Sequence, residues 1–118
     1  MPEILPAAVR IPVPGGKLIE EHVGAAASAT TELSVAHMHA PAGWSEPFQT
    51  PAFTEFSVVV HGMVTVECDG VTYECSAGQT IVTRAGERIR YGVGHEGAEY
   101  YAICLPAFTP DNVHREAE

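Results

Sequence analysis

Two histidines separated by one residue, His37 and His39, have the spacing in this chain that most directly suggests chemistry. On a β-strand, residues two apart point to the same face, so both imidazoles would project together. Two adjacent imidazoles can supply two nitrogen ligands to one metal ion. The alternative is that this face is the exterior of a sheet or a subunit interface, because Ala36 and Met38 form an equally apolar opposite face.

The elements that must position these side chains are short β-strands. From Lys17 onward, runs of β-prone residues alternate with turn signals at roughly ten-residue intervals, which is typical of a sandwich or barrel. No stretch combines a helical hydrophobic period with helix caps. We therefore predict an all-β, antiparallel chain with strands at residues 17–24, 31–40, 55–61, 80–83, 87–91 and 99–105. Turns are expected at residues 41–43, 76–78, 84–86 and 92–97.

The clearest local element is a hairpin over residues 63–75, with Asp69-Gly70 as a two-residue type I′ turn. This turn pairs the two strands residue by residue and predicts one shared apolar face: Cys68 opposite Val71, Val66 opposite Tyr73, and Val64 opposite Cys75. Cys68 and Cys75 are then not opposite each other, so no disulfide is expected between them. We expect the three cysteines to be buried thiols.

The composition excludes several classes of protein. The formal net charge is −9 with only 6 Lys and Arg residues, which argues against a nucleic-acid surface. No apolar run approaches the roughly 20 residues needed to span a bilayer, and no signal peptide is visible, so a cytoplasmic protein is expected. We expect one domain over residues 1–118, with an extended Pro-rich arm at residues 1–16 and a tail or lid at residues 106–118.

Glycines at defined spacings link the chain to a known family. Glu55, six further residues and Gly62 match the second half of the motif G-x5-H-x-H-x3,4-E-x6-G, and Gly43 matches its opening glycine. Gly78 and Gly86 match the glycines of the motif G-x5-P-x-G-x2-H-x3-N. On these motifs the chain resembles the small single-domain cupins over roughly residues 31–105, which implies an antiparallel barrel of the jelly-roll type.

The same alignment removes most of the metal ligands usual in that family. The three histidine positions fall on Gln49, Pro51 and Ile89, and only Glu55 retains the family's residue. Pro and Ile side chains offer no ligand atom, and a neutral amide is a weak one. The resemblance places Glu55 inside the barrel, where a lone carboxylate is costly unless it binds a metal, pairs or takes up a proton.

A metal site could be rebuilt from other residues. His37 and His39, with Gln49 and Glu55 entering from neighbouring segments, would make a mixed nitrogen and oxygen site. Zinc, iron, manganese and nickel all suit such a ligand set.

Further cavity residues follow from strand alternation. If Glu55 points inward, so does Ser57, and if position 89 points inward as in the family, so does Tyr91. Tyr91 would then provide a hydroxyl for ligand binding or proton transfer, or serve as an aromatic core residue. Cys104 is expected on the inner face of the last strand, and Trp44 at the mouth of the cavity or over the edge of the core.

These observations leave two main functions open, beside a structural or regulatory oligomer in which side chains fill the cavity. The first is an enzyme of the lyase, isomerase, cyclase or oxygenase class, with Glu55 as a ligand or acid–base group and Tyr91 beside it. The second is a non-catalytic module that binds a small molecule without metal. In both cases the partner is a small molecule, with neither nucleic acid nor membrane involved. The resemblance also implies a homodimer, to which the N-terminal arm could add a strand.

Overall fold

The computed structural model describes residues 1–117, and almost all of its regular structure is β-strand. The strands are β1 (Val9–Ile11), β2 (Leu18–Val23), β3 (Ser34–Ala40), β4 (Thr54–Cys68), β5 (Val71–Ser76), β6 (Thr80–Thr83) and β7 (Arg90–Leu105). A single helical turn, α1 (Ala25–Ser28), follows β2. The all-β prediction is confirmed; the helical turn was not expected.

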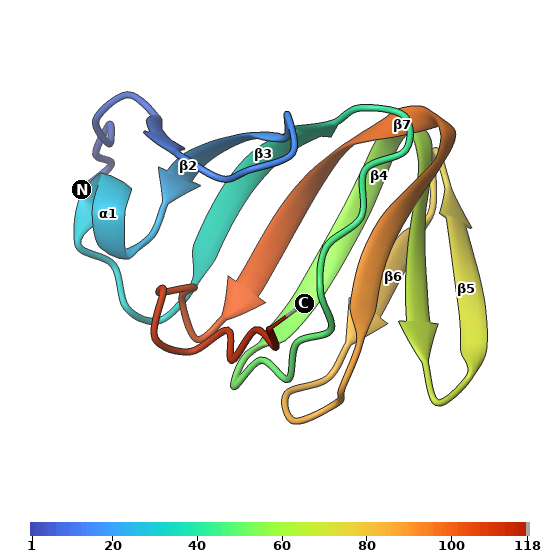
Figure 1. The fold of residues 1–118 in the computed structure, drawn as a ribbon. Coiled ribbons are helices and arrows are strands. Elements are labelled where there is room, and N and C mark those ends of the chain that lie inside the picture. The colour runs from blue at the N-terminus through green and yellow to red at the C-terminus, as the bar shows by residue number, and fades with distance from the viewer. Residues whose placement is uncertain (118) are drawn as a thin grey trace.

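The strands form one strongly curved antiparallel sheet in the order β1-β2-β3-β7-β4-β5, with β6 also paired to β4 (Figure 1). β4 and β7 are the longest strands and pair along most of their length. The first part of β4 pairs with β6 and its second part with β5. The sheet therefore folds around an interior, and β4 and β7 run through both halves of the barrel.

The hairpin prediction is confirmed in its register. Cys68 pairs with Val71, Val66 with Tyr73 and Val64 with Cys75. Both turn residues have positive φ, 50° at Asp69 and 77° at Gly70, as a type I′ turn requires. The shared apolar face is only partly buried: Val71 and Tyr73 remain about half exposed, at 51% each. β5 ends the sheet order, so nothing within the described chain covers that end of the hairpin.

The expected breaks in β4 and β7 do not occur. β4 continues through residue 62 into the hairpin, and β7 continues through residues 92–97, where a turn was predicted. The glycines bend these strands instead of ending them. Gly62 has φ 76°, and a Cβ there would lie 2.2 Å from the Gly97 carbonyl oxygen. The register of the β4–β7 ladder shifts on both sides of this contact, which marks β-bulges.

The two ends of the chain pack against the same barrel. β1 pairs with β2, so part of the expected arm belongs to this chain's own sheet. The C-terminal tail forms backbone hydrogen bonds to residues 48–52 and buries Val113 against Phe53 and Cys104. The division into arm, barrel and tail remains a proposal, and Glu118 lies outside the described residues. Within residues 1–117, no helix has the length and apolar character needed to cross a membrane.

The main apolar core lies on the inner face of β4 and β7. The residues of this core are buried and pack against one another: Ala40, Trp44, Val59, Val64, Val66, Cys75, Ile89, Tyr91, Ala98, Tyr100 and Ala102. This core fills one half of the interior. The other half, toward β2 and β3, is where the interior stays open.

Candidate functional site

A cavity of about 290 Å³ lies inside the barrel. The inner faces of β2, β3, β4 and β7 form its walls, and residues 44–49 and the C-terminal tail cover it. Apolar side chains make up much of the wall, but several ionisable groups project into it: Lys17, Glu21, Glu46, Glu55, Tyr91, Tyr100, Cys104 and Arg115. A mostly apolar cavity with a few convergent polar groups is the usual form of a small-molecule site.

Lys17, directly before β2, is the central cation of the cavity. Its Nζ donates a 2.6 Å hydrogen bond to the Tyr100 hydroxyl on β7. The same Nζ lies 4.0 Å from the centre of the Trp44 ring, which adds a cation–π contact. Burial lowers the pKa of Lys17, and the charges of Glu46 and Glu55 oppose that shift. The ammonium group is thus held by one hydroxyl and one aromatic face, and the charges of two carboxylates act on it through space.

Glu55, on β4, is one of two buried glutamates that line the cavity; Glu55 is 8% exposed and Glu21 is 2% exposed. Its Oε2 accepts a 2.7 Å hydrogen bond from Ser57, and the Cys104 thiol lies 3.7 Å from its Oε1. Burial raises the pKa of Glu55, whereas the Ser57 hydroxyl and the Lys17 charge act in the opposite direction. Burial therefore lets Glu55 keep its proton to a higher pH than an exposed glutamate does, which suits it to acid–base chemistry.

A second charged pair covers the cavity from the loop and the tail. Arg115 Nη2 lies 3.4 Å from Glu46 Oε2 and 3.3 Å from Gln49 Oε1. Burial raises the pKa of Glu46, and the charges of Lys17 and Arg115 oppose that shift. Gln49 is also fixed by its backbone, which pairs with Ile89 on one side and Arg115 on the other. The tail thereby contributes a guanidinium group directly to the site.

Tyr91 and Cys104 complete the polar wall. The Tyr91 hydroxyl is 2.7 Å from the Thr83 hydroxyl, and Tyr91 is 3% exposed. Burial and the neighbouring Glu55 charge raise the pKa of Tyr91 well above its ordinary value. The same two causes raise the pKa of the Cys104 thiol. Both groups therefore remain protonated over the physiological pH range and act as hydrogen-bond donors.

Five of the residues singled out from the sequence lie in the cavity wall: Gln49, Glu55, Tyr91, Trp44 and Cys104. Ser57 is fully buried behind Glu55 and orients that carboxyl group, but it does not line the cavity. The catalytic and ligand-binding roles suggested for these residues remain predictions.

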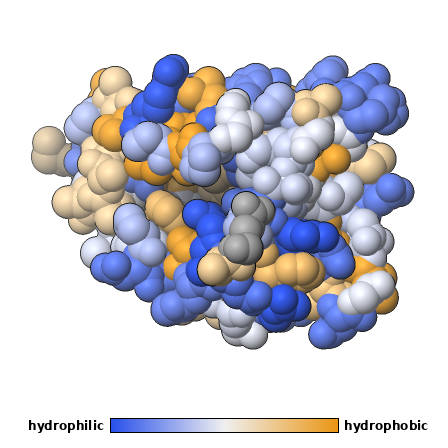
Figure 2. All heavy atoms as spheres, viewed as in Figure 1, coloured by the Kyte–Doolittle hydropathy of each residue, from blue (hydrophilic) through white to orange (hydrophobic). Residues whose placement is uncertain are grey.

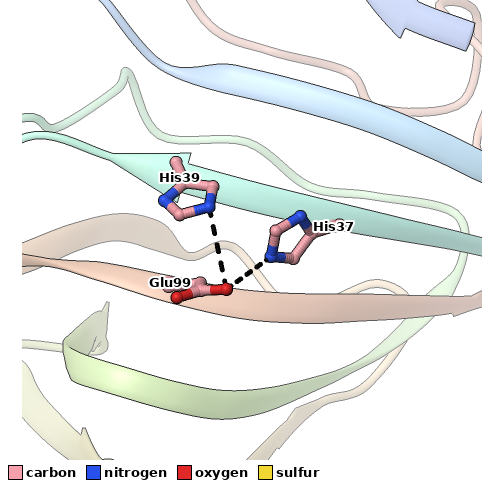
Figure 3. A group of neighbouring side chains, drawn as sticks. All are labelled: His37, His39 and Glu99. Atoms are coloured by element: carbon pink, nitrogen blue, oxygen red, sulfur yellow. Dashed lines mark hydrogen bonds and ion pairs between the residues drawn. The ribbon is translucent and has the colours of Figure 1, made fainter.

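His37 and His39 do not join this group, and the expected four-residue metal site with Gln49 and Glu55 is not formed. Ser34, Ala36 and Met38 are the β3 residues that line the cavity, so the alternation of the strand turns the histidines to the opposite, outer face. There they meet Glu99 of β7 (Figure 3).

The cavity also does not fit the metal centre usual in the resembled family. None of the described residues that line it is a histidine, and the ammonium group of Lys17 lies beside Glu55 instead. A cation in the same cavity would repel a divalent ion, and its charge already acts on Glu55. The cavity therefore offers acidic and basic side chains in place of metal ligands.

Two cavity residues that were not singled out from the sequence are the cations Lys17 and Arg115. A signal for Lys17 was available: Lys17, Ile19 and Glu21 alternate along β2 and share the inner face. Charged residues at both ends of an inward-facing row indicate a polar interior. Arg115 had no such signal, because only the folded tail brings it to the cavity.

Comparisons with known proteins add the following. The sequence model of the AraC-like ligand binding domain matches residues 34–118. The endoribonuclease YbeY of Myxococcus xanthus (strain DK1622) is 44% identical over 107 residues, which are 90% of this chain and 36% of that protein. The chain therefore spans about a third of the length of this relative.

Two solved structures share the fold. A histidine-to-glutamine variant of Streptomyces PAC13 with uridine superposes with a TM-score of 0.76, 15% identity and coverage of 94% of this chain and 86% of that chain. A structure concerned with the Mn(II) centres of Bacillus subtilis oxalate decarboxylase gives a TM-score of 0.74, 15% identity and coverage of 92% and 30%. These likenesses, with the observed sheet, confirm the predicted cupin-type barrel.

Proposed function

Because the chain belongs to the AraC-like ligand-binding domain family, with a cupin-type barrel, we propose that its cavity binds a small polar molecule and transfers protons to and from it without a metal. The observation that carries this proposal is the Lys17–Tyr100 hydrogen bond beside the buried Glu55. It combines a cation, a hydroxyl group and a carboxyl group with a raised pKa in one mostly apolar cavity. Such sets of groups are typical of acid–base sites.

In the proposed reaction, Lys17 and Tyr100 bind an oxygen atom of the ligand, where negative charge would develop. Donors fixed in a water-poor cavity stabilise that charge more strongly than water does. Glu55 takes a proton from the carbon next to a carbonyl group and returns it at the same or a neighbouring position. Isomerisation needs both steps. Elimination shares the first, after which the bond to a β-hydroxyl breaks and that hydroxyl takes the proton from Glu55 and leaves as water, so we infer a lyase or isomerase.

The cavity also restricts the ligand. Its volume of about 290 Å³ suits a molecule of roughly the size of a sugar or small hydroxy acid. Arg115 and Lys17 favour a carboxylate or several hydroxyl groups, and Trp44 offers an aromatic surface. The uridine in the PAC13 structure supports including nucleosides among the candidates.

A defined panel tests binding. Hydroxy acids, sugar acids and nucleosides, with uridine among them, are screened by saturation-transfer NMR and by thermal shift. We expect at least one member to bind wild-type protein, to bind equally after EDTA treatment, and to lose at least tenfold in affinity with Lys17→Met. Arg84→Met is the matched control, because Arg84 is exposed and does not line the cavity.

Deuterium incorporation tests catalysis. Each ligand that binds is incubated with the protein in D₂O, and exchange at carbon is followed by NMR. We expect exchange or consumption with wild-type protein and a loss of at least about 100-fold with Glu55→Gln, the usual scale of general acid–base catalysis. A panel with no binding member, or binding that EDTA abolishes, would contradict the proposal.

The family match favours a second function, in which the cavity binds its ligand without turnover. In that case a ligand binds to the wild-type protein, Lys17→Met lowers the affinity for that ligand, and no deuterium is incorporated into it. The same experiment therefore separates an enzyme from a sensor or carrier.

Other properties remain proposals. We propose neither a nucleic-acid partner nor the endoribonuclease activity named for the Myxococcus relative, because this chain spans only 36% of that protein and carries a net charge of −9. A cytoplasmic location and a homodimer also remain predictions. The exposed apolar arm residues support the homodimer, since Ile4 is 99% exposed and apolar residues gather on that side of the molecule (Figure 2).

A further inference from the structure

The outer face of the barrel carries a second cluster of titratable side chains, separate from the cavity and from the proposed reaction. His37 and His39 of β3 and Glu99 of β7 point toward one another (Figure 3). His37 Nε2 lies 2.7 Å from Glu99 Oε2, and His39 Nε2 lies 3.7 Å from the same oxygen. Two imidazole nitrogens thus converge on one carboxylate oxygen.

The spacing of these atoms suits a small divalent ion. One ligand atom from each of the three residues can be chosen so that all lie within 4.8 Å of one another. Metal–ligand bonds of about 2.1 Å hold neighbouring ligands of a tetrahedral ion about 3.4 Å apart. The observed separations of 2.7 and 3.7 Å bracket that value. Small side-chain rotations would therefore admit the ion.

The surroundings of His37 orient it for this role. Glu20 of β2 lies opposite His37 in register, and its Oε1 is 3.8 Å from His37 Nδ1. A carboxylate beside the far nitrogen of a ligating imidazole fixes the ring and strengthens the ligand. The Tyr101 ring packs at 4.8 Å on the same imidazole. His37 is thus held with Nε2 facing Glu99 and Nδ1 facing Glu20.

The cluster is accessible and has room for a further ligand. The side chains of His37, Glu99 and His39 are 17%, 32% and 48% exposed. His61 of β4, also exposed, lies opposite Glu99 in the β4–β7 register. Three strands thus bring His39, Glu99 and His61 into one row across the sheet. Solvent can reach the cluster, so water can take a fourth position, and the register places His61 in the next strand along the same row.

From this geometry we propose a surface site for a divalent transition-metal ion, Zn²⁺ by ligand type, formed by His37 Nε2, His39 Nε2 and a Glu99 oxygen. Neutral imidazole and carboxylate are ordinary Zn²⁺ ligands. Glu20 is a positioning residue that acts through His37. The site does not depend on the chemistry in the cavity, because the inner and outer faces of β3 use different residues.

Zinc and cobalt titrations of untagged protein test the site. We expect one Zn²⁺ per chain by calorimetry, and Co²⁺ bound at the same site should give visible absorption bands. His37→Ala with His39→Ala should weaken binding at least 100-fold, and Glu20→Gln about tenfold, the usual scale for a residue behind a ligand. The control His22→Ala with His114→Ala removes the same number of histidines elsewhere and should not change binding.

Glu55→Gln separates this proposal from the proposed function, since it should abolish proton transfer and leave Zn²⁺ binding unchanged. If the double histidine variant fails to fold, side-chain NMR of wild-type protein replaces it. Zn²⁺ should then shift the Nε2 resonances of His37 and His39. The proposal is overturned if wild-type protein binds no Zn²⁺, if the histidine substitutions leave binding intact, or if other histidine resonances shift instead.

Discussion

At the residue scale, the interior of this barrel depends on a few buried ionisable groups that balance one another. Lys17 is the only cation that donates directly to a cavity hydroxyl among the described contacts, and Glu55 is the carboxyl group buried most deeply beside it. Burying either charge alone would cost several kcal/mol. The attraction between the two charges reduces that cost, while burial lowers the pKa of Lys17 and raises the pKa of Glu55.

Glu55→Gln is expected to change stability in a pH-dependent way. Burial raises the folded-state pKa of Glu55 above its unfolded value. The folded protein therefore holds that proton more tightly, and the associated stability is present below about pH 4 and is lost as pH rises through the raised pKa. The amide is neutral at all pH values, so the variant should be close to wild type at pH 4 and about 1–3 kcal/mol more stable at pH 8.

Urea unfolding from pH 4 to pH 8 measures this difference. Glu74→Gln is the matched control, because Glu74 is exposed on β5 and should show a small difference with little pH dependence. A Glu55→Gln variant that is less stable than wild type at pH 8 would show that the carboxylate is more favourable there than burial implies.

At the element scale, the contact between β4 and β7 at Gly62 decides whether the long strands can bend. Gly62 has φ 76°, and a Cβ would meet the Gly97 carbonyl oxygen at 2.2 Å. Gly70 has nearly the same φ, 77°, but has no atom within 4 Å of a Cβ. The two glycines thus share a backbone conformation and differ in available space.

Gly62→Ala should therefore destabilise the protein much more than Gly70→Ala. The left-handed conformation costs an L-residue about 1–2 kcal/mol at either position. The overlap at Gly62 adds roughly 1–3 kcal/mol, because backbone must move to relieve it. Equilibrium urea unfolding of both variants measures the difference. Equal losses in the free energy of unfolding would mean that β4 and β7 can move apart at Gly62 at little energetic cost.

At the scale of the whole molecule, the N-terminal arm carries the most exposed large apolar side chains of the described residues. Met1 and Ile4 are fully exposed, and Leu5 and Val9 are more than one third exposed. Exposed apolar segments of this kind usually mark an interface. β1, which follows the arm, also ends the sheet order and offers a strand edge to a partner.

We expect light scattering coupled to size exclusion to give twice the mass of the chain. Ile4→Ser combined with Leu5→Ser should shift the protein toward the monomer, because the substitutions remove the apolar side chains that a partner would bury. Val71→Ser with Tyr73→Ser is the control at the opposite end of the sheet. A monomeric wild-type protein would refute the dimer, and dissociation by the control alone would move the interface to β5.

The sequence by itself determined the all-β class, the Asp69-Gly70 hairpin with its register, and the cupin-type barrel. These features depend on local rules: strand alternation, turn chemistry and glycines at fixed spacing. Alternation also gave the shared face of His37 and His39, but it could not say which face is inside, because Ala36 and Met38 are apolar enough for either side. Tertiary structure decided that question when β3 paired between β2 and β7.

Only the tertiary structure assembled the two candidate sites. Lys17, Glu55 and Arg115 are far apart in the chain, and they meet because β2, β4 and the tail enclose one cavity. Glu99 joins His37 and His39 because β7 pairs with β3 in a register that no local pattern specifies. Long-range pairing sets which side chains are neighbours, and a charged residue gives no sign in the sequence of the partner that it will meet.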